Sequence, residues 1–203
     1  MRPVLVRNLV RLYGEADAVD MIDGANWYPK ARAIVIEWAN FHSLSRATVA
    51  CVIAALSPQN EWTRNLVQAG EVLRDEPLSI RGFPRNERIA RAILRDRAET
   101  VIGPDYFKSA PKVLSFAGNL AGSDEYVTVD VHATQAALND VNSLVVLPWQ
   151  HYLSMAAAYE VAAKQVGRSN AEFQAIIWLT WKRKFPTAAK RHLRTQWSFV
   201  DQF

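Results

Sequence analysis

The spacing of apolar residues constrains the fold of this chain more than any other feature, because it follows a helical period almost throughout. In "KARAIVIEWANFH" the apolar side chains recur at i, i+3, i+4 and i+7, the pattern of an amphipathic helix. They are Ala31, Ile34, Val35, Trp38 and Phe41. In "SRATVACVIAAL" nearly every residue after Ser45 is apolar. This second pattern predicts a central helix that is buried all round and has Ser45 as its N-cap.

Further helical stretches follow, with short connections between them. Pro111 suits the first turn of a helix that we expect to end at Gly122, a later helix closes at Gly167, and the next stops before Pro186. The one strand-like stretch, "YVTV", is too short and isolated to build a sheet. The sequence therefore predicts an all-α protein, a compact bundle of about nine or ten helices. We expect a single domain over residues 1–203, either one unit or two lobes that share a cleft.

Composition excludes several classes of protein. No apolar run approaches the roughly 18 residues that cross a bilayer, so we expect a soluble protein with no membrane partner. Residues 1–17 carry arginines among their apolar positions, which predicts an amphipathic helix rather than a signal peptide. The single cysteine, Cys51, cannot form an internal disulfide and is expected to be a small buried hydrophobe. These features favour a reducing, cytoplasmic location.

The charge distribution favours a partner that carries phosphates. The formal net charge is +4, and "WKRKFPTAAKRHLR" near the C-terminus contains basic residues and no acid. Such a block is either a solvated face or a phosphate-binding surface, and the neighbouring tryptophans favour nucleic acid. The candidate phosphate-binding residues are Lys182, Arg183, Lys184, Lys190, Arg191 and Arg194. Nothing in the sequence indicates an obligate protein partner.

Asp130 stands where "YVTV" gives way to the helical stretch "VHATQAAL". An Asp in this place is an N-cap, or a carboxylate held at the mouth of a cleft. His132 either orients a neighbour or hydrogen-bonds locally, and it is a candidate contact to a base. The other histidines are scattered and there is no pair of cysteines. We therefore expect no metal site and no cofactor.

A second candidate stretch is "AALSPQNEWTRN", in which a buried helix ends near Ser57 and another begins near Asn60. We expect Gln59 to be exposed on this tight turn. It is either a solvated residue or a polar wedge that contacts a base edge, since its amide both donates and accepts. Asn60 and Trp62 are further candidate contacts to a base or to DNA. Trp178, by contrast, lies on an apolar face and is expected to pack in the core.

The third candidate is Lys112 in "DYFKSAPK", which precedes Asp130 by 18 residues. A lysine at the start of a helix is usually solvated. One that is desolvated beside a cleft can act as a nucleophile.

Taken together, these three stretches resemble the helix-hairpin-helix DNA glycosylase superfamily, the group of endonuclease III and MutY. The stretch "AALSPQNEW" resembles the family's turn of the S-x-Q or Q-Q kind, and "TVDVHA" resembles its signature aspartate stretch of the V-D-T-H type. In bifunctional members a hairpin lysine precedes that aspartate by the interval that separates Lys112 from Asp130. The resemblance covers residues 45–140.

The resemblance implies a glycosylase-like fold and cleavage of the N-glycosidic bond of a base that is extruded from duplex DNA. It implies that Asp130 is the catalytic carboxylate, that Gln59 fills the gap left by the extruded base, and that Lys112 is a Schiff-base candidate. A preplaced carboxylate stabilises the positive charge that develops on the sugar during such cleavage.

The chain departs from the family's pattern in the hairpin, which in the family is glycine-rich and of the L-P-G-V-G-x-K kind. Here "YFKSAPK" has no glycine and Pro111 lacks an N–H, so the expected hairpin is degenerate. The chain is also similar to phage proteins of the α-glutamyl/putrescinyl-thymine pyrophosphorylase type. That likeness implies a transferase that hypermodifies a hydroxymethyl-pyrimidine in DNA, in a bacterial or phage-infected cell. A third alternative is a non-catalytic DNA-binding protein on the same fold.

Overall fold

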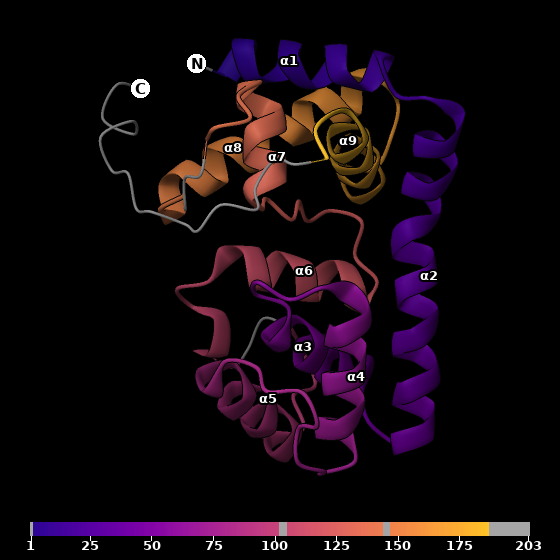
Figure 1. Ribbon diagram of the computed structural model, residues 1–203, viewed down its shortest axis with the longest axis vertical. Coiled ribbons are helices and arrows are strands. Elements are labelled where there is room, and N and C mark those ends of the chain that lie inside the picture. Colours follow the sequence, from indigo (N-terminus) through magenta and orange to yellow (C-terminus); the bar gives the residue numbers. More distant parts are fainter. Residues whose placement is uncertain (1, 102–104, 144–146, 187–203) are drawn as a thin grey trace. The chain divides into compact units, whose positions relative to one another are not determined.

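The computed structural model describes residues 2–101, 105–143 and 147–186, and its regular structure is helical (Figure 1). These described residues form nine α-helices and one short 3₁₀ turn, η1 (Asp105–Phe107), and include no β-strand. The prediction of an all-α protein is therefore confirmed. None of the helices in these ranges is both long and apolar enough to span a membrane. The helices are α1 (Arg2–Gly14), α2 (Ala18–His42), α3 (Arg46–Leu56), α4 (Trp62–Leu73), α5 (Pro84–Asp96), α6 (Pro111–Ala121), α7 (Val131–Leu138), α8 (Trp149–Gln165) and α9 (Asn170–Lys184).

The chain forms two compact units. Unit 1 combines Met1–Pro29 with Asp124–Phe203, and unit 2 is Lys30–Ser123. Helix α2 contributes residues to both units, because the boundary between Pro29 and Lys30 falls inside it. The expectation of one domain over residues 1–203 stays a prediction.

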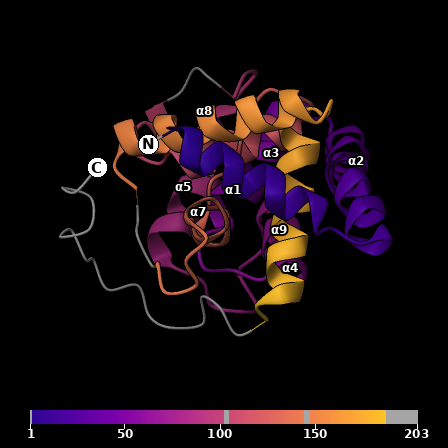
Figure 2. The ribbon, with the colours of Figure 1, turned by 90° about the horizontal axis from the view of Figure 1, so that it is seen from above.

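The core of unit 1 forms where α1, α7, α8 and α9 pack against one another (Figure 2). Helix α1 contributes Leu5, Leu9 and Leu12, all of them buried. They belong to the same cluster as Tyr159 and Phe173, whose rings meet edge to face at an interplanar angle of 72°, with 6.0 Å between centroids. Removing such large apolar side chains from water is the main force that holds these four helices together.

The segment "YVTV" is extended, but it pairs with no strand among the residues that the structure describes. A tyrosine of α8 satisfies its backbone instead. The hydroxyl of Tyr152 donates to the carbonyl oxygen of Val127 at 2.7 Å and accepts from the N–H of Val129 at 3.1 Å. The hydroxyl of Tyr28 lies 3.1 Å from Thr128 Oγ1. These contacts fix the segment that leads into α7.

Helix α3 is the centre of unit 2 and contacts α4, α5 and α6. Its residues 47–56 are all buried. The Ser45 side chain caps the helix by accepting the N–H of Thr48 at 3.0 Å, and both hydroxyls donate to the carbonyl oxygen of Ala98 at 2.7 Å. Cys51 is buried, and this burial raises its pKa to about 12. The predictions of a central helix capped by Ser45 and of a buried Cys51 are confirmed.

Most of the predicted helix ends are also confirmed. Helix α6 begins at Pro111 and is closed by Gly122, whose φ of +124° suits glycine. Gly167, with φ +70°, follows α8, and Pro186 follows α9.

Helix α2 ends at His42, as the periodic stretch predicts, but it differs from the sequence prediction in its start and in the exposure of Phe41. It begins at Ala18, well before the expected start, because the Asp17 carboxylate accepts backbone N–H groups of the first turn at 2.9 Å. Pro29 therefore lies inside the helix, where it removes one backbone donor. Phe41 was expected on the buried face, and this prediction is wrong: the side chain is 79 % exposed at the last turn.

Candidate functional site

Asp130 is the N-cap of α7, one of the two alternatives that the sequence leaves open, and both of its carboxylate oxygens are held by N–H donors. Oδ1 accepts the backbone N–H of Ala133 at 2.8 Å. Oδ2 accepts the indole N–H of Trp178 at 3.0 Å. The residue is half-buried and forms no ion pair with a described lysine or arginine. Its carboxylate is thus fixed in direction by two neutral donors from α7 and α9.

Two buried tyrosines of α8 support this position. Tyr152 holds the extended segment before Asp130, as described above. The hydroxyl of Tyr159 donates to the carbonyl oxygen of Ala133, in the first turn of α7, at 2.9 Å. Burial raises the pKa of Tyr159 well above its usual value, and the negative charge of Asp130 raises it further. Both effects favour the neutral hydroxyl, the form that donates this hydrogen bond.

Trp178 links Asp130 to two other predicted site residues. Its ring lies at right angles to the imidazole of His132, with 6.0 Å between centroids. Lys182, one turn further along α9, places Nζ 3.9 Å from the centroid of the Trp178 ring, a cation–π contact. We call Asp130, His132, Trp178 and Lys182 the Asp130 cluster; all four belong to unit 1.

Trp178 is the residue that sequence reasoning missed. It was expected in the core but is half-buried, because its indole N–H donates a hydrogen bond to Asp130. The sequence could have predicted the contact between Trp178 and Lys182, because residues four apart on one helix lie next to each other on its surface.

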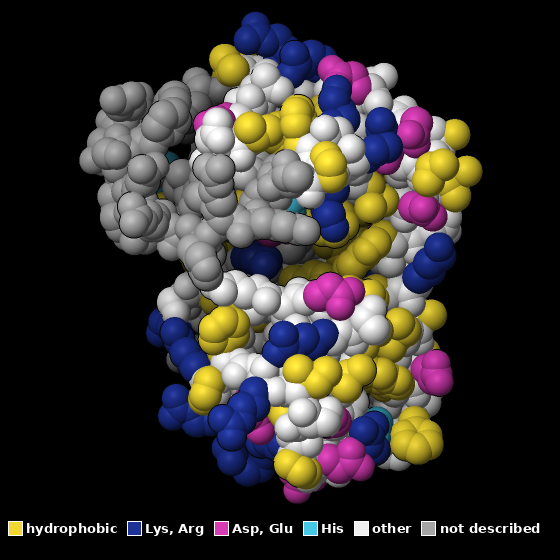
Figure 3. Space-filling view, viewed as in Figure 1, with side chains coloured by type: hydrophobic (Ala, Val, Ile, Leu, Met, Phe, Trp, Pro, Cys, Tyr) yellow, Lys and Arg dark blue, Asp and Glu magenta, His cyan; other side chains and the backbone are white. Residues whose placement is uncertain are grey.

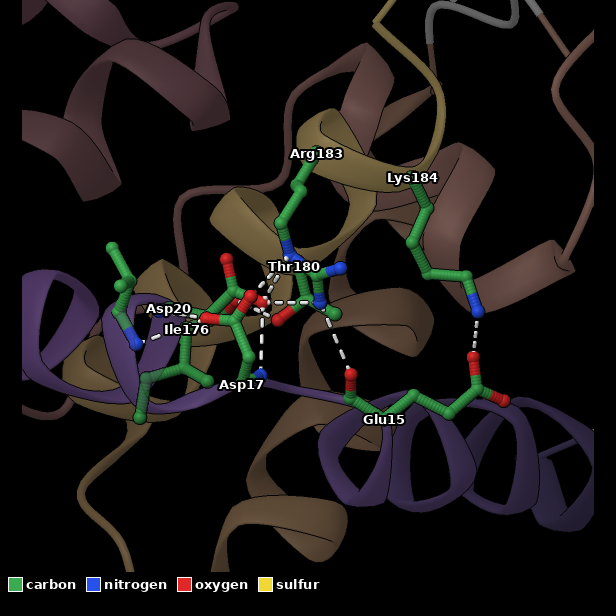
Figure 4. Close-up of polar contacts among 8 residues, drawn as sticks. Glu15, Asp17, Asp20, Ile176, Thr180, Arg183 and Lys184 are labelled. Atoms are coloured by element: carbon green, nitrogen blue, oxygen red, sulfur yellow. Dashed lines mark hydrogen bonds and ion pairs between the residues drawn. The ribbon is translucent and has the colours of Figure 1, made fainter.

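Two of the six predicted phosphate-binding cations are engaged within unit 1 (Figure 4). Arg183 donates from Nε and Nη2 to Asp20 Oδ2 at 2.8 and 2.6 Å, and its Nε lies 3.1 Å from Asp17 Oδ2. Lys184 pairs with Glu15 at the end of α1. The hydrogen bond from Lys184 is the main cause that lowers the pKa of Glu15. Carboxylates of this unit therefore compensate the charge of both cations.

Of the other four predicted phosphate-binding cations, the structure describes Lys182. Lys182 is exposed and rests on Trp178. Lys190, Arg191 and Arg194 lie outside the described residues.

The predicted turn at Gln59 is present in unit 2. The N–H of Asn60 donates to the carbonyl oxygen of Ser57 at 3.1 Å, which closes a β-turn with Pro58 and Gln59 at its centre. Gln59 is exposed, as predicted, and has a φ of +55°. Residues other than glycine rarely adopt this left-handed backbone conformation, so the backbone of Gln59 is strained, whereas that of a glycine at this position would not be.

Asn60 holds this turn in place. Its Nδ2 donates to the carbonyl oxygen of Leu56 at 3.1 Å and to Gln68 Oε1 at 2.6 Å. Gln68 in turn donates to the carbonyl oxygen of Ile80 at 2.9 Å. The amide hydrogens of Asn60 are therefore used within unit 2, and among the turn residues 57–60 the exposed side chain is that of Gln59.

Trp62 and Lys112 also belong to unit 2. Trp62 begins α4, is half-buried, and meets the ring of Phe116 at a steep angle with 6.3 Å between centroids. Lys112 lies in the first turn of α6 and is half-buried, with no ion-pair partner among the described residues. Before it, η1 and a bond from the N–H of Ala110 to the carbonyl oxygen of Phe107 at 2.8 Å form the turn that the sequence predicts as a degenerate hairpin.

The predicted site residues are thus divided between the two units. Asp130, His132 and Lys182 lie in unit 1, whereas Gln59, Asn60, Trp62 and Lys112 lie in unit 2. Within the ranges that the structure describes, no three His, Cys, Asp or Glu side chains are grouped to hold a metal ion.

These features define an all-α protein of two helical units with an oriented, helix-capping carboxylate. The chain belongs to a family described as "Family of unknown function (DUF7178)", whose model matches residues 2–185. No curated protein and no solved structure matches the chain.

Proposed function

We propose that this protein is a DNA-directed enzyme that acts on a base extruded from the duplex, with Asp130 as its central carboxylate. The observation that carries the proposal is the double restraint of that carboxylate by Ala133 and Trp178. Both donors are neutral N–H groups, so the charge of Asp130 is oriented without being cancelled by a cation. This is the arrangement required of a group that must stabilise positive charge as it develops.

The proposed reaction is cleavage of the N-glycosidic bond. As that bond breaks, positive charge builds on the sugar, and a carboxylate held beside it lowers the barrier electrostatically or by activating water. The base must leave the stack before this chemistry can occur. Trp178 contacts the carboxylate and His132 contacts Trp178, so both supply ring surfaces for a flipped nucleotide, while Lys182 supplies a charge for its phosphate.

The residues of unit 2 have supporting roles in the proposal. Gln59 fills the gap in the duplex, which is consistent with an exposed amide kept on a strained turn. Trp62 stacks on a base, and Lys112 is the candidate for a Schiff base. Asn60 acts by holding the turn, since its amide donors are used internally. Arg183 and Lys184 are assigned a structural role, because both are bonded to carboxylates of unit 1, and they are not proposed to bind phosphate.

The test is to incubate the purified protein with duplexes that contain thymine, uracil or hydroxymethyluracil, digest the DNA, and weigh the nucleosides. We expect loss of one base and an alkali-labile abasic site. Asp130→Asn should abolish this product while binding DNA within a few-fold of the wild type, because Asn caps a helix as well as Asp does. Asp140→Asn is the matched control, since the Asp140 side chain accepts the N–H of Asn142 at 2.9 Å and, within the described ranges, no other donor.

Other outcomes assign the alternatives. A base of increased mass, formed in the presence of an activated hydroxymethyl-pyrimidine and an amine, would indicate the transferase. Salt-dependent DNA binding with every base unchanged, and identical in Asp130→Asn, would leave a non-catalytic DNA-binding protein.

A further inference from the structure

Helix α5 and the residues that flank it concentrate the positive charge of the chain. Residues 81–97 contain six arginines and two carboxylates, a net charge of +4, which equals the net charge of all 203 residues. The rest of the chain is therefore neutral in sum. The arginines are Arg81, Arg85, Arg88, Arg91, Arg95 and Arg97.

Three of these arginines share one face of α5. Ala90 and Ile93 are fully buried and fix the side of the helix that packs on unit 2. With 3.6 residues per turn, Arg85, Arg88 and Arg95 project away from that buried side, and all three are exposed. Figure 3 shows Lys and Arg side chains gathered over the part of unit 2 in which α5 runs. We call these three residues the α5 arginine face.

The α5 arginine face is not neutralised by the unit that carries it. Arg91, on the edge of the face, is bound internally: it contacts Glu87 at 3.0 Å, Asp75 at 3.2 Å and the carbonyl oxygen of Glu76 at 2.6 Å. Arg85 and Arg88 form no ion pair within the described part of the chain. Arg95 lies 3.4 Å from Asp96, but their side chains are 75 % and 47 % exposed, so water screens this pair. Arg183, by contrast, is compensated by two carboxylates, those of Asp17 and Asp20.

We propose that the α5 arginine face is the surface through which the protein binds the phosphate backbone of duplex DNA. The identity of this partner rests on the proposed function. Arg85 to Arg95 spans about 15 Å along the helix axis at 1.5 Å per residue, and duplex DNA presents one phosphate charge per roughly 1.7 Å of its length. A row of guanidinium groups carried on one helix matches such an array, and each group can bind a phosphate through two N–H bonds. No large apolar side chain lies between these arginines on the same face, as insertion into a lipid surface would require.

The test compares two variants that lose equal charge. The first carries Arg85→Gln, Arg88→Gln and Arg95→Gln. The control carries Arg7→Gln, Arg46→Gln and Lys164→Gln, three exposed cations on α1, α3 and α8 without ion pairs among the described residues. Binding of the full chain to a labelled 20-base-pair duplex is measured by fluorescence anisotropy over a range of salt concentrations. Circular dichroism checks that both variants retain their helices.

Three lost phosphate contacts at about 0.9 each should lower the slope of log affinity against log salt by roughly 2.7 in the α5 variant. Its affinity at low salt should fall about tenfold or more, whereas the slope of the control should change by less than about one unit. An unchanged slope in the α5 variant, or an equal change in both variants, would overturn the proposal. So would intact DNA binding combined with lost binding to phosphatidylserine vesicles, because that result would assign the face to a membrane surface.

The outcome is distinguishable from failure of the proposed function. Binding is measured without turnover, and the α5 variant keeps Asp130 and all of its neighbours. If the slope falls as expected but no base changes mass in the wild type, the arginine face stands and the catalytic proposal fails. If bases change mass while the α5 variant binds with the wild-type slope, the catalytic proposal stands and the proposal for the α5 arginine face fails.

Discussion

Nε1 of Trp178 lies 3.0 Å from Oδ2 of Asp130, so an aromatic side chain of α9 orients the carboxylate that begins α7. Replacing Trp178 by Phe keeps a ring but removes this donor. We expect Trp178→Phe to lower the free energy of unfolding by about 1 kcal/mol and to lower kcat by about tenfold with little change in KM, since the interaction directs the reacting carboxylate.

Urea denaturation and steady-state turnover measure these two effects. Trp149→Phe is the control, because Trp149 is exposed at the start of α8; its stability should stay within about 0.5 kcal/mol of the wild type. If Trp178→Phe keeps the kcat of the wild type, Trp178 has no part in catalysis, and its hydrogen bond to the helix-capping Asp130 is structural only.

Lys112 gives a prediction that separates two mechanisms. If it forms a Schiff base with the opened sugar, borohydride should trap a covalent complex between protein and DNA. The trap should disappear in Lys112→Ala and persist in Lys108→Ala, because Lys108 lies four residues earlier, in the turn before α6. Absence of any trapped complex, together with base release, would establish a mechanism that uses Asp130 without a lysine nucleophile.

The pair of Asp20 and Arg183 predicts a stability effect within unit 1. Asp20 is only 4 % exposed and is bonded to Arg183 through two nitrogens. Asp20→Asn should lower the free energy of unfolding by about 1–2 kcal/mol at neutral pH, less than for a fully buried pair because water reaches Arg183. Asp17→Asn should cost less than about 0.5 kcal/mol, because Asp17 is exposed and Asn preserves its capping oxygen.

This effect should depend on pH in one direction. Burial opposes ionisation of Asp20, but the hydrogen bonds from Arg183 and from the Asp17 N–H outweigh it, so the pKa of Asp20 is lowered. A carboxyl group of this kind adds stability above its unfolded pKa of about 3.9, and this stability is lost as pH falls through the folded pKa. The difference between wild type and Asp20→Asn should therefore be constant from about pH 5 to 7 and shrink below about pH 4. A difference that grows on acidification would contradict the assignment.

Gly24 of α2 lies close against Ile176 of α9. A Cβ at this position would lie 2.5 Å from Ile176 Cγ1 and 2.7 Å from Ile176 Cα, so backbone would have to move. We expect Gly24→Ala to destabilise the protein by about 2–3 kcal/mol, the cost of overpacking a close contact. Gly14→Ala is the matched control, since nothing lies within 4 Å of the added carbon; it should be neutral or slightly stabilising. Equal thermal midpoints for the two variants would exclude the close approach.

Local chemistry made much of the fold predictable. The N-caps Ser45 and Asp130 and the helix boundaries at Pro111 and Gly122 were all predicted, because each depends on residues within one turn of the chain. The start of α2 was not, because it depends on the cap at Asp17, which lies well before the apolar period of residues 30–42.

The contacts that define the candidate site were beyond such local reasoning. The partners Trp178 and Asp130 are 48 residues apart, and Arg183 and Asp20 are 163 residues apart. A basic run such as residues 182–184 gives the charge of each side chain but not which carboxylates will fold against it. Only the tertiary structure separates Lys182, which rests on an indole, from its two compensated neighbours.

Gln59 allows the backbone of the turn and its side chain to be tested separately. Gly relieves the strain of a φ of +55°, so Gln59→Gly should be neutral or stabilising by up to about 1 kcal/mol, whereas Gln59→Ala keeps the strain and should be nearly neutral. Both variants lack the amide. If that amide fills the gap left by an extruded base, both should weaken binding to a duplex with an abasic site by about tenfold, a typical cost of one to two lost hydrogen bonds. Equal loss of binding despite unequal stability would assign the role to the side chain, and a loss in Gln59→Gly alone would assign it to the rigid turn.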